Sequence, residues 1–167
     1  MPKGVPLFYL HTQCPHDTSG LIIFWEETMA GRSIINVNNA PAAIGPYSQG
    51  VKYCDLIFVS GQLPIDPATN QMVANDISQQ THQVIKNLKN ILESTGGTLF
   101  NVIKTTVFLA SMDDFDAMNK VYAQYFSHEP PARACVEVSR LPKNARVEIE
   151  AIAHLPKPKN MGSGLLY

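Results

Sequence analysis

The chain has 167 residues, of which 45% are hydrophobic and 16% charged, and its formal net charge is -1. This length and composition predict one domain with a hydrophobic core. The low charged fraction indicates a surface that other subunits partly cover. Near-neutral charge without a run of Lys or Arg argues against a nucleic-acid partner, because phosphate neutralisation needs clustered cations. No apolar run approaches the ~20 residues that a membrane span needs, so we expect no membrane partner.

Cysteine and histidine usage limits the kinds of site that the chain can carry. The three cysteines, Cys14, Cys54 and Cys135, are odd in number and lack C-x-x-C spacing. This usage predicts a reducing compartment without a disulfide framework or a zinc site. We expect a cytoplasmic protein, and the choice between cytosol and organelle stays open. The five histidines are scattered, and no pair has the ligand spacing of a helical metal site. We therefore expect no metal.

Residues 1–33 do not resemble the rest of the chain. They contain several prolines and a short apolar run, residues 21–25, which is too short for a signal-peptide core and lacks a basic start. Met29 stands in frame just before the regular pattern begins. We interpret residues 1–33 as an N-terminal extension of unknown role. Two alternatives stay open, an upstream addition to a start at Met29 and an ordered arm that packs on a neighbour.

Residues 34–154 form one predicted domain, followed by a C-terminal tail over residues 155–167. Its first part predicts three short strands, of which the last two form a hairpin around Cys54 and Asp55. The three strands cover residues 34–37, 48–53 and 56–60. A turn-rich loop after the first strand ends at Tyr47, which is either an ordered site residue or, more often in such a place, a half-buried packing residue.

Two amphipathic helices follow a proline-containing loop over residues 62–75. Apolar residues repeat at helical spacing over residues 77–94, where Asp76 can cap the start and glycines end the helix. The second helix is predicted at 113–127, and we interpret its apolar stripe as core rather than as a cofactor-binding surface. Asn119 lies beside this stripe and faces either a cleft or solvent.

The strands predicted around these helices complete one sheet. A β-branched strand is predicted at 101–109, and a strand reached through a helix usually makes a parallel, right-handed crossover. Residues 130–153 have the strict alternation of two further strands, at 132–140 and 145–153, with a turn between them.

Polar side chains on these last two strands are candidates for a site. Arg133 and Cys135 share one face of the first strand, where they either hold a small anion or belong to a solvated sheet face, and the pattern alone favours the solvated face. If the turn closes simply, Glu137 faces Glu148 across the two strands. Two facing carboxylates are unfavourable without cations or subunit neighbours, so this register hints at a site between subunits, although the other register stays open.

The predicted order of elements is β-β-β-α-β-α-β-β, an α+β fold in which two helices lie on one face of a six-stranded mixed sheet. Two helices cover only part of such a sheet. The other face carries many small and apolar side chains, and we expect copies of the same chain to bury it.

Three blocks of sequence are specific enough to indicate a family. Residues 39–50 read Asn-Ala-Pro-Ala-Ala-Ile-Gly-Pro-Tyr-Ser-Gln-Gly, residues 59–62 read Val-Ser-Gly-Gln, and residues 131–151 contain Pro-Ala-Arg-Ala-Cys-Val-Glu-Val, Leu-Pro-Lys and Glu-Ile-Glu-Ala. Together they resemble the RidA/YjgF family of enamine/imine deaminases over residues 34–154. The resemblance implies a chorismate-mutase-like fold and a homotrimer with three clefts between subunits. It also implies hydrolysis of 2-imino or 2-enamino acids, such as 2-iminobutanoate and 2-iminopropanoate, to 2-keto acids and ammonia.

The same resemblance implies roles for individual residues. Arg133 is similar to the family's carboxylate-binding arginine, and its fork suits a carboxylate because it donates two parallel hydrogen bonds. Glu148 is similar to the acidic residue that handles water, which suits a general base. The remaining substrate-binding positions are Tyr47, Ser60, Gly61, Asn119 and Cys135.

Cys135 has a simpler interpretation than a catalytic one, and the enzymatic function has a non-catalytic alternative. Cys135 is favoured as a small packing residue over a nucleophile, because no His lies on these two strands to activate its thiol. No cofactor is expected, because small imines already hydrolyse in water. The alternative function is a non-catalytic trimer that binds or senses small 2-keto acids, for which Arg133 alone is sufficient, whereas an enzyme needs Glu148 as well.

Overall fold

The computed structural model describes residues 31–155, and residues 1–30 and 156–167 lie outside the described part of the chain. The predicted N-terminal extension and C-terminal tail therefore fall almost wholly outside it. The chain divides into two units, residues 1–31 and residues 32–167, and the fold below belongs to the second unit.

The second unit has the α+β architecture that the sequence predicts. A mixed sheet contains six strands in the order β1-β2-β3-β8-β6-β7, and β4 and β5 form a separate two-stranded sheet inside the segment predicted to be a loop. The strands and helices are β1 (Arg32–Ile35), β2 (Gly50–Tyr53), β3 (Leu56–Gln62), β4 (Ile65–Asp66), β5 (Gln71–Met72), α1 (Ile77–Glu93), β6 (Val102–Leu109), α2 (Phe115–Tyr125), β7 (Ala132–Glu137) and β8 (Val147–His154).

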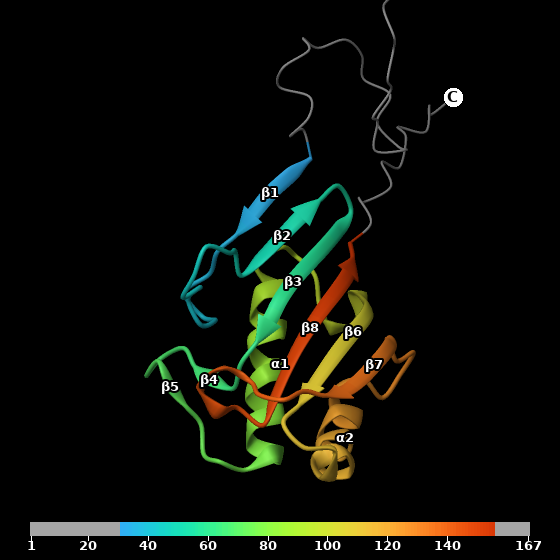
Figure 1. The fold of residues 1–167 in the computed structure, drawn as a ribbon. Coiled ribbons are helices and arrows are strands. Elements are labelled where there is room, and N and C mark those ends of the chain that lie inside the picture. Colours follow the sequence, from blue (N-terminus) through green and yellow to red (C-terminus); the bar gives the residue numbers. More distant parts are fainter. Residues whose placement is uncertain (1–30, 156–167) are drawn as a thin grey trace, which may run out of the picture. The chain divides into compact units, whose positions relative to one another are not determined.

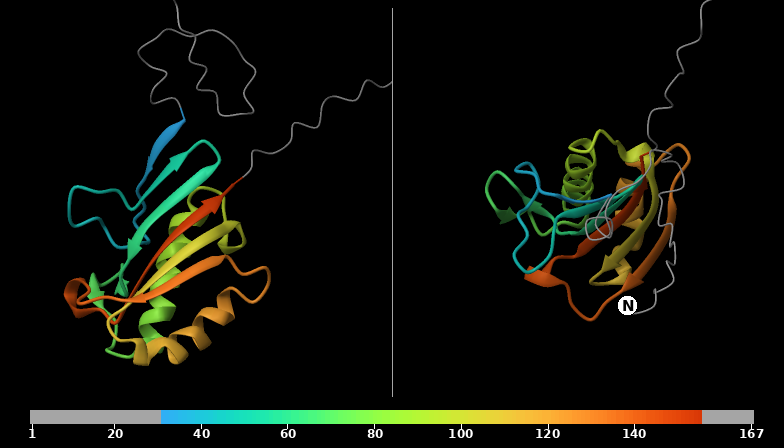
Figure 2. Two further views of the ribbon diagram at one scale, coloured as in Figure 1. Left: turned by 45° about the vertical axis from the view of Figure 1, so that its right-hand side comes forward. Right: turned by 90° about the horizontal axis from the view of Figure 1, so that it is seen from above.

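Both helices cover the same face of the six-stranded sheet (Figure 1, Figure 2). Helix α1 packs along β3 and β8 and against α2, which lies under β6 and β7. Alternate residues of each central strand point into this layer, for example Ile57 and Val59 of β3 and Ile149 of β8, all of which are buried. The hydrophobic core therefore lies between the helices and one sheet face.

The helix boundaries follow from local capping. Asp76 caps α1, because its side chain accepts a hydrogen bond of 2.8 Å from the backbone N–H of Gln79. Gly96 follows the helix with a φ of +83°, a left-handed conformation that favours glycine. Helix α2 begins later than predicted, because Ser111 accepts from the Asp113 N–H and residues 112–114 form a 3-10 turn first.

The pairing predicted between the last two strands is wrong. β6 lies between β7 and β8, pairing parallel with β7 and antiparallel with β8. The connection from β7 to β8 runs past the end of β6 instead of closing a hairpin (Figure 1), and it contains left-handed Lys143 and Asn144. Alternation along a strand specifies which face a residue takes but not which strand lies beside it, so the pattern did not reveal the intervening strand.

The start of β8 is fixed by a buried carboxylate. Asp114, which is 7% exposed, accepts hydrogen bonds from Nε and Nη2 of Arg146, the former at 2.9 Å. The backbone N–H of Arg146 also donates to Oε1 of Gln80 on α1, at 2.8 Å. These bonds join both helices to the residue that precedes β8, and so they position Glu148 two residues further on.

The sheet face opposite the helices carries apolar side chains in register. One row across the sheet runs through Ile34, Val51, Phe58, Ile152, Lys104 and Ala132. In the described structure Ile34 and Phe58 are 51% and 42% exposed. This face, called the open face below, is covered by no helix of the described chain.

Candidate functional site

Arg133 lies on β7 and points toward the helix layer. Its Nη1 donates a hydrogen bond of 2.8 Å to Oδ1 of Asn119 on α2. The guanidinium carbon also lies 4.6 Å from the ring centroid of Tyr122 and 5.7 Å from that of Phe115. Cys135 follows on the same face and packs against the core. The structure thus brings together Asn119, Arg133 and Cys135, and the Arg133 side chain is held rather than free in solvent.

The Cys135 thiol is in a poor state for nucleophilic attack. Burial raises the pKa of this thiol, and the positive charge of Arg133 offsets only part of that rise. A raised pKa leaves the thiol protonated at neutral pH, whereas a nucleophile needs the thiolate. This environment agrees with the interpretation of Cys135 as a packing residue.

Cys135 of β7 is a free thiol. The reducing compartment inferred from cysteine usage stays a prediction.

Glu148 lies with Ser60 and Gly61 on the open face. Consecutive residues of β8 alternate between the two faces, and half-buried Glu148 lies between buried Val147 and Ile149. Gly61 stands at a β-bulge in β3, where the pairing with β8 shifts between Val59 and Gln62. A methyl group at Gly61 would overlap Oε1 of Glu148, so the carboxylate lies directly against the glycine.

The Ser60 side chain is tied to the loop that carries Tyr47. Its hydroxyl donates to the carbonyl of Ser48 at 2.6 Å. Buried Gln49 anchors the same loop, because its amide Nε2 donates to the carbonyls of Val37, Ala40 and Pro41. The Tyr47 side chain is 50% exposed.

The two groups do not meet within one chain. Arg133 of β7 pairs with Thr105 of β6, and Thr105 pairs on its other side with Ala151 of β8. Ala151 lies three residues along β8 from Glu148. Two strand spacings of about 4.8 Å and three residues of about 3.3 Å place the Cα atoms of Arg133 and Glu148 roughly 14 Å apart. Their side chains also point to opposite faces. Arg133 and Glu148 therefore cannot act on one small substrate within a single chain.

The Glu148 carboxyl has a pKa above its ordinary value. Burial is the main cause, and the negative charge of Glu150 on the same face adds to it. Glu148 takes part in neither ion pair of the described residues, because these pairs join Lys89 with Glu93 and Arg146 with Asp114. Such a carboxyl accepts a proton more readily than an exposed one, which suits a general base.

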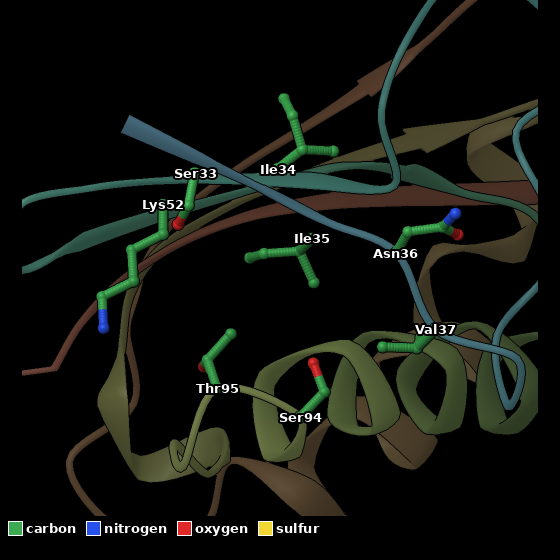
Figure 3. Close-up of a pocket in the computed structure, with 8 residues that line it drawn as sticks. All are labelled: Ser33, Ile34, Ile35, Asn36, Val37, Lys52, Ser94 and Thr95. Atoms are coloured by element: carbon green, nitrogen blue, oxygen red, sulfur yellow. The ribbon is translucent and has the colours of Figure 1, made fainter. Parts of the chain in front are cut away.

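The hollows of the described surface lie away from most of these residues. One of about 320 Å³ lies between β1 and the end of α1, where Ile35 points toward Ser94 and Thr95 (Figure 3). A second, of about 550 Å³, is lined by Met112, Phe115 and two aspartates at the start of α2. Neither is lined by a predicted site residue, although Phe115 also contacts Arg133.

The described residues contain neither a metal-binding cluster nor a membrane-spanning helix. Among residues 31–155, no cluster of three or more His, Cys, Asp or Glu side chains has the arrangement needed to hold a metal ion. No helix in the same part of the chain is long and apolar enough to cross a membrane.

Comparison with known proteins identifies the family. Residues 37–155 match the model of the family described as endoribonuclease L-PSP. The chain belongs to this family. The match spans nearly all the described residues and includes every predicted site residue.

Relatives and solved structures of the endoribonuclease L-PSP family cover the same region. A RutC family protein of Pyrococcus horikoshii is 54% identical over 123 residues, which are 74% of this chain and 98% of that protein. Human 2-iminobutanoate/2-iminopropanoate deaminase is 45% identical over 122 residues, 73% of this chain and 89% of the relative. The structure of the YjgF gene product of E. coli has a TM-score of 0.71 and 43% identity, with 73% and 98% of the two chains covered. These matches confirm the RidA/YjgF resemblance and the fold class.

The two rings that face Arg133, those of Phe115 and Tyr122, were not predicted as part of the site. Tyr122 lies beneath the guanidinium, and the Tyr122 hydroxyl is hydrogen-bonded to Thr105 at 2.8 Å. The sequence interpretation placed Tyr122 in the core stripe of α2. Its spacing of three residues from Asn119 was the available signal, because residues three apart lie on the same side of a helix.

Proposed function

We propose that the chain is a deaminase that hydrolyses 2-imino or 2-enamino acids to 2-keto acids and ammonia, with 2-iminobutanoate and 2-iminopropanoate as substrates. The family and its members support deaminase activity on reactive intermediates. Mouse and human relatives named 2-iminobutanoate/2-iminopropanoate deaminase are 48% and 45% identical to the chain. An Arabidopsis thaliana relative named Reactive Intermediate Deaminase A, chloroplastic, is 40% identical over 152 residues.

The observation that carries the proposal is the state of Arg133. Its guanidinium is held by Asn119 and two aromatic rings, and it is in no ion pair with a described carboxylate. A guanidinium without an acidic partner has a carboxylate-binding edge available. Every 2-imino acid carries the carboxylate that this edge would bind.

Glu148 is the proposed base for hydrolysis. Water adds to the electrophilic C=N carbon, Glu148 accepts a proton from the water, and the nitrogen becomes protonated. The resulting tetrahedral carbinolamine then loses ammonia and forms the C=O of the 2-keto acid. These steps add water, move protons and release ammonia, so the proposal uses neither a metal nor a cofactor.

The proposal includes a homotrimer, because the two groups of site residues lie on opposite faces of one sheet. The group of Arg133, Asn119 and Cys135 would meet the group of Ser60, Gly61 and Glu148 only across a contact between copies. Exposed apolar side chains on the open face support such a contact, since burying them stabilises assembly. Tyr47, on its exposed loop, would close one side of each cleft.

The test generates 2-iminobutanoate with a threonine dehydratase and follows release of 2-ketobutanoate with and without the protein. The proposal expects faster release with the wild-type chain. Arg133→Ala should lower kcat/KM by roughly 10- to 150-fold, the equivalent of one charged hydrogen bond of about 1.5–3 kcal/mol. Glu148→Gln should bind 2-ketobutanoate normally and lose turnover. Equal release rates at high protein concentration would instead support the non-catalytic binder.

Two other properties stay predictions. The family is described as an endoribonuclease. A net charge of -1 does not favour phosphate binding, so nucleic acid is not a proposed partner. The cytoplasmic location also stays a prediction, and the Arabidopsis relative is named chloroplastic.

A further inference from the structure

Three residues of α2 face the guanidinium of Arg133. Phe115, Asn119 and Tyr122 are spaced by four and three residues, which places them on one side of the helix. Asn119 accepts a hydrogen bond from Nη1, whereas the two rings approach the guanidinium carbon at 5.7 and 4.6 Å. The nearer ring, that of Tyr122, therefore restricts how the guanidinium can tilt.

The ring of Tyr122 is itself fixed in place. Its hydroxyl lies 2.8 Å from the hydroxyl of Thr105, which is fully buried on β6. Phe126 stacks on the ring with centroids 4.4 Å apart. Turning the ring away would leave the Thr105 hydroxyl buried without a partner, which is costly. Burial also raises the pKa of the Tyr122 phenol, so the ring stays neutral at physiological pH.

The sheet register brings these groups together. Thr105 of β6 and Arg133 of β7 are direct partners in the parallel pairing. Paired residues point to the same face, so both side chains approach α2 at the same level. A chain of contacts thus runs from Thr105 through Tyr122 to Arg133.

One edge of the guanidinium remains available. Arg has five N–H donors, and the hydrogen bond to Asn119 uses one at Nη1. The edge formed by Nε and Nη2 makes no hydrogen bond with any residue in the described part of the chain. This edge has the fork geometry that matches a carboxylate.

We propose that Tyr122, held by Thr105, is a positioning residue that orients the Nε–Nη2 edge of Arg133 toward the carboxylate of the substrate. Tyr122 contacts the arginine rather than the reacting carbon, so its substitution changes the affinity for acids more than the rate of the chemical step. The inference rests on the proposed function only through the substrate's carboxylate.

The test measures binding of 2-ketobutanoate to the purified full chain by calorimetry, with 2-ketobutanamide as an uncharged probe of the same shape. Tyr122→Leu should weaken binding of the acid by about 2- to 30-fold, the range of a cation–π contact. The same change should leave amide binding within about twofold, because an uncharged amide gains little from the arginine's charge. Tyr122→Phe keeps the ring but loses its hydrogen bond to Thr105, so it should weaken acid binding by about 2- to 10-fold, as Thr105→Val does.

Tyr125 provides the matched control on the same helix. Its hydroxyl also has a partner, Nδ1 of His82 at 2.8 Å, but its ring contacts His82 rather than Arg133. Tyr125→Leu should therefore leave the acid affinity unchanged. An equal loss in both leucine variants, or an equal loss for acid and amide, would show general damage and overturn the inference.

Two further measurements keep the inference testable if Tyr122→Leu does not fold. Thr105→Val should weaken acid binding by about 2- to 10-fold, whereas Thr105→Ser, which keeps the hydroxyl, should restore it. When Arg133→Lys is already present, adding Tyr122→Phe or Thr105→Val should not weaken acid binding further. If either substitution weakened acid binding as much as it does in the wild-type chain, the inference would be overturned. A chain that binds the acid normally but does not accelerate imine hydrolysis would contradict only the proposed function.

Discussion

Arg133 and Glu148 occupy environments that act on their charges in opposite ways. The guanidinium of Arg133 is stabilised by Asn119 and by the ring faces of α2. The carboxylate of Glu148 is half-buried beside the negative charge of Glu150, which disfavours its ionised form. A cation that approaches the open face would remove this penalty.

The raised pKa of Glu148 makes a prediction about stability. Between the ordinary pKa of a glutamate and the higher pKa in the folded chain, the folded state binds more protons, so the free energy of unfolding falls as pH rises. Glu148→Gln removes this penalty. It should therefore raise the free energy of unfolding at pH 7, and the gain should vanish below about pH 4.3. Urea unfolding across this pH range measures it.

A matched control for Glu148→Gln is Glu93→Gln on α1. Glu93 is exposed and forms an i,i+4 pair with Lys89 at 3.6 Å. Such pairs contribute little, so the control should change stability slightly in the destabilising direction. Equal stabilisation by both substitutions would mean that net charge, rather than the site of Glu148, produces the effect.

At the scale of elements, the bulge in β3 determines how closely β3 approaches Glu148. Gly61 lies in this bulge, and its φ is not in the left-handed region, so alanine can adopt the same backbone conformation. The three heavy atoms nearest to an added methyl group all belong to the Glu148 side chain. Since that side chain can move, the fold tolerates the change but the carboxylate loses its position.

Gly61→Ala should therefore separate activity from stability. We expect the free energy of unfolding to change by less than about 1 kcal/mol, and kcat/KM for 2-iminobutanoate hydrolysis to fall by about tenfold or more, because misplacing a catalytic group by 1 Å can cost 100-fold. Gly97→Ala, after α1, meets only ordinary contacts of 3.4 Å or more and serves as the control. Unchanged activity in Gly61→Ala would count against Glu148 as the base.

Periodicity in the sequence was sufficient to predict most elements of the fold. Six of the strands, both helices and the cap at Asp76 are present within a few residues of their predicted positions. β4 and β5 were missed because strands of two residues are too short to alternate. The position of β6 between β7 and β8 was missed because strand adjacency depends on tertiary packing, which alternation does not encode.

The candidate site was predicted as a set of residues but not as an arrangement. Arg133 and Cys135 do share a face, and Ser60, Gly61 and Glu148 do lie together. That these groups take opposite faces follows from the sheet order, which the sequence pattern did not contain. The ring beneath Arg133 was missed for a similar reason, since Tyr122 serves both the core and the guanidinium.

At the scale of the whole molecule, the separation of the two groups predicts that each active cleft needs two chains. Arg133→Ala chains keep an intact Glu148 group, and Glu148→Gln chains keep an intact Arg133 group. When the two inactive variants are unfolded together and refolded as mixed trimers, about a quarter of the clefts should receive both intact groups. Imine hydrolysis should therefore recover to about a quarter of the wild-type rate per chain.

A mixture of wild-type chains with chains that carry both substitutions is the matched control. If each cleft takes one group from each of two neighbouring chains, about a quarter of its clefts are intact as well, although half of the chains are wild type. If instead both groups came from one chain, the two single variants would give no recovery and the control would keep about half of the activity. The two mixtures thus give equal rates only if Arg133 and Glu148 act across a boundary between copies.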